Sequence, residues 1–162
     1  MTVASSQDDV QLQRCPHLVI KADTPKGRGV FATKDIPAYT VIDVCPVLVL
    51  EIEENKKHIE KTSLYHYTYN WPQTDAYGNN QVAQAVVFGL GSMFNHSTQE
   101  QNVGWIRDLG RKIIVYRALR DIPAGQELCI SYGSHLTFKD ADIVPPTPPE
   151  EEIEQLRMID PY

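Results

Sequence analysis

Three short segments of the 162-residue chain combine residue types that could hold a small ligand and act on it. Residues 26–32 (KGRGVFA) place two glycines and two basic side chains in one turn. Residues 92–97 (SMFNHS) join an amide to an imidazole, and residues 127–133 (ELCISYG) bring a phenol near the end of an extended run. Glycine lets the backbone approach a ligand closely, and a basic side chain can pair with a carboxylate. The first segment lacks the third glycine and the strand-to-helix context of a dinucleotide-binding loop, which argues against a Rossmann fold.

Taken in this order and at these separations, the three segments resemble the SET domain of protein lysine methyltransferases. The resemblance covers roughly residues 18–134, and the GLGSMFNHS and YTYNW wording is especially similar to short, stand-alone SET proteins. It implies a mainly β, β-clip-like SET fold of several small sheets with few short helices. It also implies a pseudoknot-like threading of the C-terminal segment, which is an exception to simple chain paths.

The resemblance implies a binding site for the methyl donor S-adenosylmethionine (AdoMet). In the family, the glycine loop contacts the methionine end of the cofactor, and the Asn-His pair holds it, the histidine largely through main-chain hydrogen bonds to the adenine edge. The residues carried over to this chain are Lys26, Gly27, Arg28, Gly29, Asn95 and His96. Taken singly, the loop could equally be a solvated turn and the Asn-His pair a helix cap.

The resemblance also assigns aromatic residues to the reaction. Tyr132 matches the family's tyrosine beside the transferred methyl group, so it is expected to be catalytic and to contact the cofactor. Residues 64–71 alternate aromatic and polar side chains, which predicts a strand with Tyr65, Tyr67 and Tyr69 on one face. Tyr67 is the first choice for the wall of a lysine channel, although a plain cross-strand aromatic stripe remains open. Phe138 is expected to stack on the adenine.

Departures from the family pattern bear on metal binding. The family's common NHSC reads NHST at residues 95–98, and no cysteine cluster follows Tyr132. Cys15, Cys45 and Cys129 are widely spaced, so a cysteine zinc cluster is not expected, and Cys45 and Cys129 are expected to be small buried side chains. We therefore predict no structural zinc and no other metal. The usual PN after the motif becomes Gln-Asn, which makes Asn102 a looser match.

Composition limits the classes of partner. The net charge is 15 − 21 = −6, with 42% hydrophobic and 22% charged residues, which is ordinary globular usage. The acidic balance disfavours nucleic-acid binding and favours a basic partner such as a lysine-rich peptide. Neither a membrane span nor a secretory signal is visible. A nuclear location, with the cytoplasm as the alternative, is expected from the proposed substrate alone.

The chain divides into three parts on this reading. Residues 1–16 form an N-terminal flank, and residues 17–134 form the SET catalytic domain. Residues 135–162 form a Pro-rich spacer and an acidic helix, which is expected either to complete the substrate channel or to make a homodimer contact through Ile153, Leu156 and Ile159. Within the domain, Pro46 is expected to split an apolar run into two strands or to mark a sheet edge. The repeated ATKDIPA and ALRDIPA segments are expected to do the same local job at opposite ends of the domain.

The sequence thus predicts an AdoMet-dependent protein lysine N-methyltransferase whose leading substrate is a histone tail. Two alternatives stay open. One is a catalytically silent SET-like module that binds peptides, and the other is a methyltransferase of a non-histone protein. The sequence does not indicate which lysine is modified or how many methyl groups are added.

Overall fold

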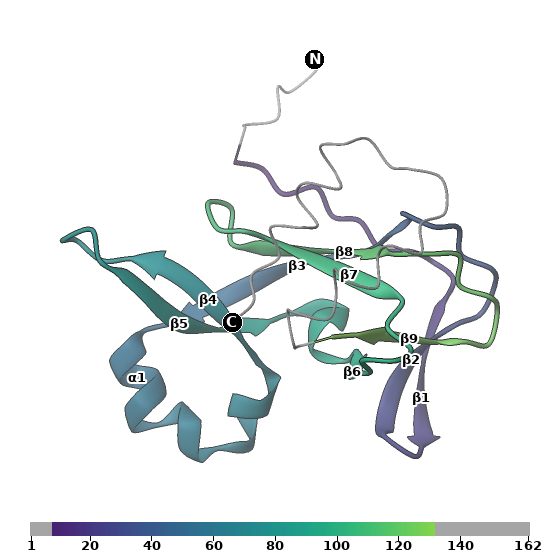
Figure 1. Ribbon diagram of the computed structural model, residues 1–162, viewed down its shortest axis with the longest axis horizontal. Coiled ribbons are helices and arrows are strands. Elements are labelled where there is room, and N and C mark those ends of the chain that lie inside the picture. The colour runs from purple at the N-terminus through teal and green to yellow at the C-terminus, as the bar shows by residue number, and fades with distance from the viewer. Residues whose placement is uncertain (1–7, 132–162) are drawn as a thin grey trace.

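The computed structural model describes residues 8–131. The expectations placed on Tyr132, on Phe138 and on residues 135–162 therefore lie outside the described residues, as does the threading of the C-terminal segment. What the model does describe is mainly β, with two separate sheets and four short helical segments (Figure 1). This agrees with the fold class expected from the sequence.

The larger sheet has five antiparallel strands. In spatial order, its strands are β4 (Thr68–Thr74), β5 (Asn80–Val87), β3 (Val41–Leu50), β8 (Ile113–Ala118) and β7 (Val103–Asp108). β-Branched residues dominate β3 and β8, which suits a half-buried pleated surface. Ile42, Ile114 and Tyr116 in this sheet are completely buried. This sheet is the platform from which the site segments are held.

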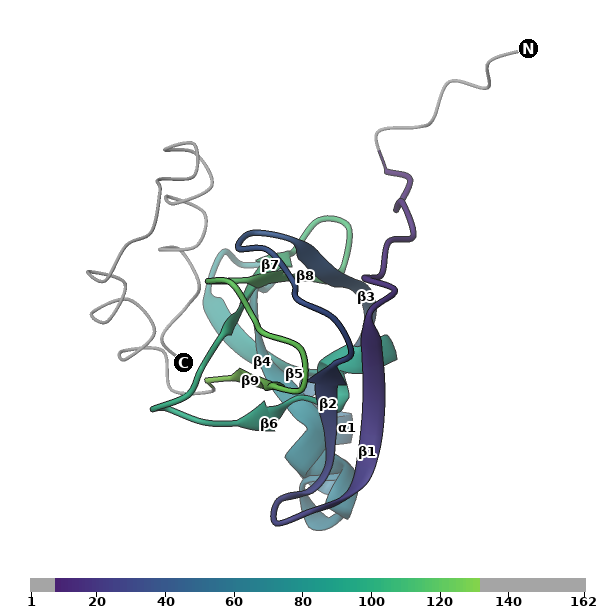
Figure 2. The same ribbon diagram turned by 90° about the vertical axis from the view of Figure 1, so that its right-hand side faces the viewer.

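The smaller sheet carries the site motifs. Its strands run in the order β1 (Leu18–Thr24), β2 (Gly27–Ala32), β9 (Glu127–Ile130) and β6 (Asn95–His96). The β1–β2 hairpin projects below the larger sheet, and β9 and β6 lie beside β2 (Figure 2). β6 pairs with β9 in parallel, whereas the other neighbours in this sheet are antiparallel. Segments that are distant in sequence therefore meet in one small sheet.

Pro46 lies in an unbroken central strand, so the expectation of two strands or a sheet edge was wrong. β3 pairs with β8 through residues 41–46 and with β5 through residues 47–50. The proline stands where the strand changes partner, and its carbonyl still accepts a hydrogen bond from the Phe88 N–H at 3.0 Å. A proline costs a ladder bond only where its missing N–H would have faced an acceptor, and the change of partner avoids that loss.

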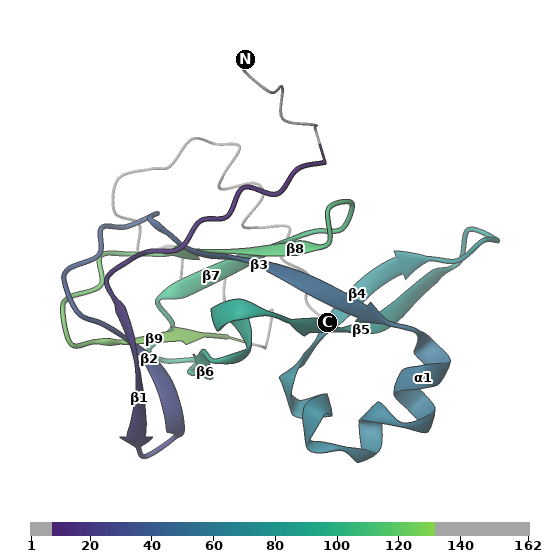
Figure 3. The same cartoon turned by 180° about the vertical axis from the view of Figure 1, so that it is seen from behind.

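The tyrosine segment also differs from the expectation. A helical region follows β3 and consists of α1 (Ile52–Lys57), η1 (Ile59–Lys61) and η2 (Ser63–Tyr67), seen opposite the β1–β2 hairpin in Figure 3. Strand β4 begins only at residue 68, so Tyr65 and Tyr67 lie on a 3₁₀ helix and do not share a strand face with Tyr69. Tyr65 and Tyr67 are exposed, whereas Tyr69 is buried.

The two DIPA segments lie side by side, which corrects the expectation that they act at opposite ends of the domain. Ile36 and Ile122 exchange both backbone hydrogen bonds at 2.8 Å. Asp121 accepts the Ala38 N–H at 2.7 Å, and Asp35 accepts the Ala124 N–H at 2.8 Å. The repeat therefore forms a nearly symmetric clasp that joins the chain after β2 to the chain before β9.

Among the described residues, no helix is long and apolar enough to cross a membrane.

Candidate functional site

The glycine loop enters the site through Gly29 on β2. Gly29 is buried, and a Cβ added there would lie 2.5 Å from Glu127 Oε1 and 2.9 Å from Asn95 Nδ2. No side chain fits in that space without moving its neighbours. Glycine is favoured at position 27 for a different reason, because the φ of Gly27 is +83°, a left-handed conformation that other residues rarely adopt. The side chains of Lys26 and Arg28 belong to exposed residues at the start of the strand.

Asn95 links the three motif segments through its side-chain amide. Its Nδ2 donates to the carbonyl of Arg28 at 3.0 Å and to the carboxylate of Glu127 at 2.7 Å. These two bonds use both amide hydrogens and fix the amide plane. The carbonyl oxygen Oδ1 is therefore the atom that Asn95 can offer to a ligand, and it can only accept a hydrogen bond.

The parallel pairing of β6 with β9 brings the third motif to the same place. Asn95 lies opposite Cys129 and His96 opposite Ile130, and the Ser97 N–H donates to the carbonyl of Ile130 at 2.9 Å. The indole N–H of Trp105 donates to the carbonyl of Ser131 at 3.3 Å. The described chain ends at Ser131, so it is anchored beside the Asn-His pair one residue before Tyr132.

A 3₁₀ turn, η3 (Gly89–Ser92), aims the Asn-His pair at this sheet. Gly91 packs so closely that an added Cβ would lie 2.5 Å from the Tyr116 hydroxyl. The Gly91 carbonyl accepts a hydrogen bond from the Tyr69 hydroxyl at 2.8 Å. The buried ring of Phe94 then packs on Tyr116, with 5.0 Å between ring centroids. The glycine punctuation and the aromatic residues of GLGSMF thus fix the path of the turn.

Charge around the pair is mixed. Burial raises the pKa of the Cys129 thiol to about 11, and the carboxylate of Glu127 adds to the rise while Lys26 opposes it. Cys129 is therefore a neutral buried thiol at physiological pH and not a nucleophile. The expectation that Cys45 and Cys129 are buried is confirmed, and Cys15 is buried as well; all three are free and at most 6% exposed.

Glu127 and Asn102 are the residues of the site that sequence reasoning missed or undervalued. Glu127 holds the Asn95 amide, as described above. Asn102 is fully buried; its Nδ2 donates to the Glu127 carbonyl at 2.7 Å, and its Oδ1 accepts the Cys129 N–H at 2.8 Å. Asn102 therefore acts as a brace on β9. A charged residue at the start of the otherwise apolar ELCI strand was the feature of the sequence that could have indicated the role of Glu127.

The predicted site residues thus fall into three groups. Gly29, Asn95 and the main chain of Arg28 are in contact, with His96 beside them on β6. Tyr67 lies on η2, an element of the helical region and not of this sheet. Tyr132 and Phe138 lie outside the described residues. Two surface cavities of about 220 and 340 Å³ lie beside the N-terminal flank and the DIPA clasp, and none of the motif residues lines them.

Metal binding has no candidate cluster in the described part of the chain. Within residues 8–131, no group of three or more His, Cys, Asp or Glu side chains is arranged to hold a metal ion. The absence of zinc from the whole protein stays a prediction. The chemistry that the site offers is instead a carbonyl acceptor at Asn95, backbone groups exposed by glycine, and basic side chains for an anionic group.

Comparison with known proteins supports one family. A family model described as the SET domain matches residues 27–133. The histone-lysine N-methyltransferase of Schizosaccharomyces pombe described as H3 lysine-37 specific is 45% identical over 123 residues, which cover 76% of this chain and 78% of that protein.

Two solved structures have a similar fold. A candidate histone methyltransferase of Plasmodium falciparum is 22% identical, with a TM-score of 0.54, and the match covers 75% of this chain and 95% of that one. CpSET8 of Cryptosporidium is 26% identical, with a TM-score of 0.55, over 72% of this chain and 57% of that one.

Proposed function

The chain belongs to the SET domain family, and we propose that it is an AdoMet-dependent histone lysine N-methyltransferase whose substrate is histone H3. The observation that carries the proposal is the double hydrogen bond of Asn95, which joins the glycine loop to the ELCISYG strand. The same arrangement brings His96 beside β9. The S. pombe relative, described as specific for H3 lysine 37, directs the proposal to histone H3.

The residues present fit the proposed methyl donor. Asn95 Oδ1 can accept from the α-ammonium group of AdoMet, and Lys26 and Arg28 can pair with its carboxylate. A Cβ on Gly29 would displace Glu127 and Asn95, so glycine at this position keeps the Asn95 amide in the orientation that leaves Oδ1 for the ligand. When bound, AdoMet supplies an electrophilic methyl group on a positively charged sulfur.

The residues around the substrate lysine have a separate task, because an ammonium group has no lone pair and the amine must arrive neutral. An apolar channel lowers the pKa of the amine by desolvation, and a nearby positive charge lowers it further. Holding the two reactants in line can contribute several kcal/mol, about 7 or more at the upper limit. Weak C–H···O contacts from carbonyl oxygens can orient the methyl group.

Tyrosines are proposed to complete the channel. Tyr132 follows directly after Ser131, whose carbonyl is anchored by Trp105, and its hydroxyl is proposed to orient the amine. Tyr67 remains the first choice for the channel wall, and it is an exposed residue on η2. Tyr69 instead supports the η3 turn through the Gly91 carbonyl. Phe138 is proposed to stack on the adenine.

The substrate and location follow from charge and relationship. The net charge of −6 complements a lysine-rich histone tail. A nuclear role in chromatin regulation is proposed with the histone substrate. The homodimer is proposed as one of two roles for residues 135–162, the other being closure of the channel within one chain. Light scattering at micromolar concentration decides between a dimer and a monomer.

The direct test is a methyl-transfer assay with labelled AdoMet and recombinant histones. Label on histone H3, mapped by mass spectrometry to one lysine, is the expected result. A Tyr132→Phe variant is expected to lose most turnover while its AdoMet affinity stays within about three-fold of the parent, which calorimetry measures.

Other outcomes identify the alternatives. Transfer to proteins of a cell lysate but not to histones would indicate a non-histone substrate. If calorimetry detected no AdoMet binding while a histone peptide still bound, the chain would be a silent peptide-binding module and the proposal would be wrong.

A further inference from the structure

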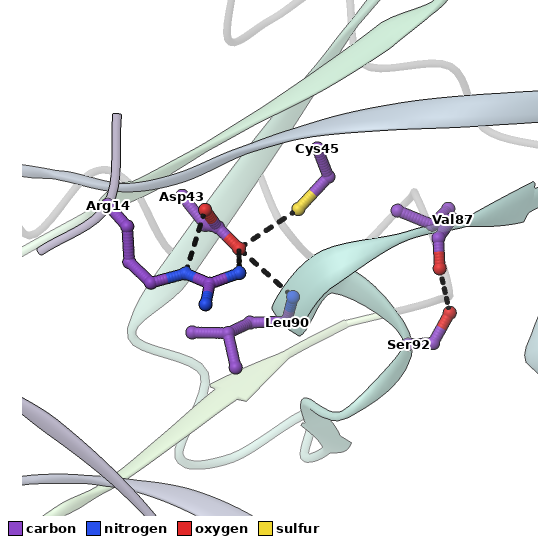
Figure 4. Close-up of polar contacts among 6 residues, drawn as sticks. All are labelled: Arg14, Asp43, Cys45, Val87, Leu90 and Ser92. Carbon is purple, nitrogen blue, oxygen red and sulfur yellow. Dashed lines mark hydrogen bonds and ion pairs between the residues drawn. The ribbon is translucent and has the colours of Figure 1, made fainter. Parts of the chain in front are cut away.

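Outside the site itself, the described chain contains a buried carboxylate that the proposed reaction does not use. Asp43 is the third residue of β3 and is 3% exposed. Its Oδ2 accepts the Leu90 N–H at 3.0 Å and the Cys45 thiol at 3.3 Å (Figure 4). Leu90 is the second residue of η3, the turn that leads to Asn95 and His96. The carboxylate therefore holds the start of the turn that presents the Asn-His pair.

The positive charge that accompanies this carboxylate comes from the N-terminal flank. Arg14 donates from Nε to Asp43 Oδ1 at 3.2 Å and from its terminal nitrogen Nη2 to Oδ2 at 3.0 Å, a two-point contact (Figure 4). The flank is bonded to β3 on both sides of this contact. The Cys15 N–H donates to Ile42 and the Val44 N–H donates to Gln13, at 2.9 and 3.0 Å.

The exposures of the two partners are unequal. The Arg14 side chain is 53% exposed and the Asp43 side chain 5%. The guanidinium is therefore partly solvated by water, whereas the carboxylate depends on its hydrogen bonds to protein groups. The Asp43 hydrogen bond raises the pKa of Arg14, and burial and the Asp43 charge raise that of Cys45 to about 12. Arg14 is thus the cation that compensates a buried anion.

The geometry leaves little room for this group to shift without moving the turn. A Cβ on Gly89 would lie 2.9 Å from Asp43 Oδ2 and 3.1 Å from Arg14 Nη2. Gly89 has a φ of +73°, so the turn begins in a conformation that glycine favours. The other end of η3 is held by the Ser92 hydroxyl, which donates to the Val87 carbonyl at 2.5 Å (Figure 4).

We propose that Arg14 is a positioning residue for the methyl-donor site, acting through Asp43 and the Leu90 N–H on the turn that presents Asn95 and His96. This inference rests on the proposed function. It adds a residue outside the stretch that the SET family model matches, which begins at residue 27. Without Arg14, the buried carboxylate loses its two-point partner, and its rearrangement toward water loosens its hold on Leu90.

The test measures AdoMet binding by calorimetry at 20 °C, together with the melting temperature and the KM for a histone H3 peptide at saturating AdoMet. Arg14→Met is expected to raise the Kd for AdoMet about ten-fold and to leave the peptide KM within about two-fold. Arg111→Met is the matched control. Arg111 makes a similar contact with Asp108, at 2.8 Å, in the β7–β8 turn, and its loss is expected to leave AdoMet binding unchanged.

A second pair of variants separates positioning from folding. In the Arg14→Met background, Asp43→Asn removes the unpaired charge and keeps an acceptor for Leu90, whereas Asp43→Ala removes the acceptor as well. The Asn version is expected to bind AdoMet within about three-fold of the parent, and the Ala version about ten-fold more weakly than the Asn version.

Three results would overturn the proposal or its premise. If Arg14→Met lowered the melting temperature but left the AdoMet Kd within two-fold, Arg14 would serve stability alone. If the two double variants bound AdoMet with equal affinity, the contact between Asp43 and the Leu90 N–H would have no role in the methyl-donor site. A parent protein that bound no AdoMet would instead refute the proposed function, so the two failures can be told apart.

Discussion

Replacing Gly29 with alanine tests the contact between the glycine loop and the Asn-His segment. The new methyl group would lie 2.5 Å from Glu127 Oε1 and 2.9 Å from Asn95 Nδ2. The φ of Gly29 is not among the positive values in the described chain, so alanine adds no backbone strain there. The whole effect must come from the displaced side chains.

The expected magnitude follows from the bond that these side chains make. The Asn95–Glu127 bond at 2.7 Å has a charged acceptor, and such a bond contributes about 1.5–3 kcal/mol. Both groups are ends of flexible side chains, so the fold can yield without collapsing. Losing the orientation of the Asn95 amide is therefore expected to raise the Kd for AdoMet about 10- to 100-fold.

Calorimetric titration of AdoMet into Gly29→Ala measures this change directly. Gly110→Ala is the control, because a Cβ there meets its nearest neighbour, Asp108 Oδ1, at an ordinary 3.6 Å. The control is expected to bind like the parent. Parent-like affinity in Gly29→Ala would show that the Asn95–Glu127 contact does not shape the cofactor site, and the reasoning would be refuted.

Three further changes test other contacts. Glu127→Gln keeps an acceptor for Asn95 but removes its charge, so AdoMet affinity is expected to fall about five-fold by calorimetry, since charge-assisted bonds are roughly twice as strong as neutral ones. Cys45 has a pKa raised to about 12 against 9.0 for an unperturbed thiol. Its neutral form therefore stabilises the fold fully below pH 9, and this contribution is lost as the pH rises toward 12. Urea midpoints from pH 8 to 10.5 are expected to fall less steeply in Cys45→Ala than in the parent. Asp121→Ala removes the acceptor of the Ala38 N–H at 2.7 Å, so the free energy of unfolding is expected to fall by about 1 kcal/mol in urea titration.

Each of these has a result that contradicts it. If Glu127→Gln bound AdoMet with the parent affinity, the charge of Glu127 would not contribute to the cofactor site. Identical pH slopes for Cys45→Ala and the parent would mean that the thiol does not titrate differently in the folded state. For the clasp, Asp35→Ala is the symmetric counterpart, because Asp35 accepts the Ala124 N–H. A loss in one variant but not the other would contradict the symmetry of the clasp.

The strand content was predictable because local pattern and tertiary environment agree. Residues 103–108 and 113–118 flank a short turn and form the β7–β8 hairpin. The prediction that Tyr65 and Tyr67 lie on a strand was wrong. The aromatic residues alternate with period 2, but this pattern does not reveal that residues 63–67 form a 3₁₀ helix. The prediction for Pro46 was wrong for another reason. The rule against proline in a central strand assumes that the strand keeps the same neighbour along its length, whereas β3 pairs first with β8 and then with β5.

The site was predictable only as far as motifs identify residue types. Gly29 and Asn95 lie in contact, and this contact depends on the parallel pairing of β6 with β9, which joins segments more than 30 residues apart. No local sequence pattern predicts the pairing of β6 with β9. The Arg14–Asp43 contact was likewise invisible, because an arginine in a flank and an aspartate in an apolar strand gain meaning only when β3 brings them together.

A crystal structure with bound S-adenosylhomocysteine would show where the cofactor lies relative to the glycine loop and the Asn-His pair. We expect the ligand beside β6, with its ammonium group within hydrogen-bond distance of Asn95 Oδ1 and its carboxylate near Arg28. A ligand seated elsewhere, with Asn95 and Gly29 out of contact with it, would contradict the account.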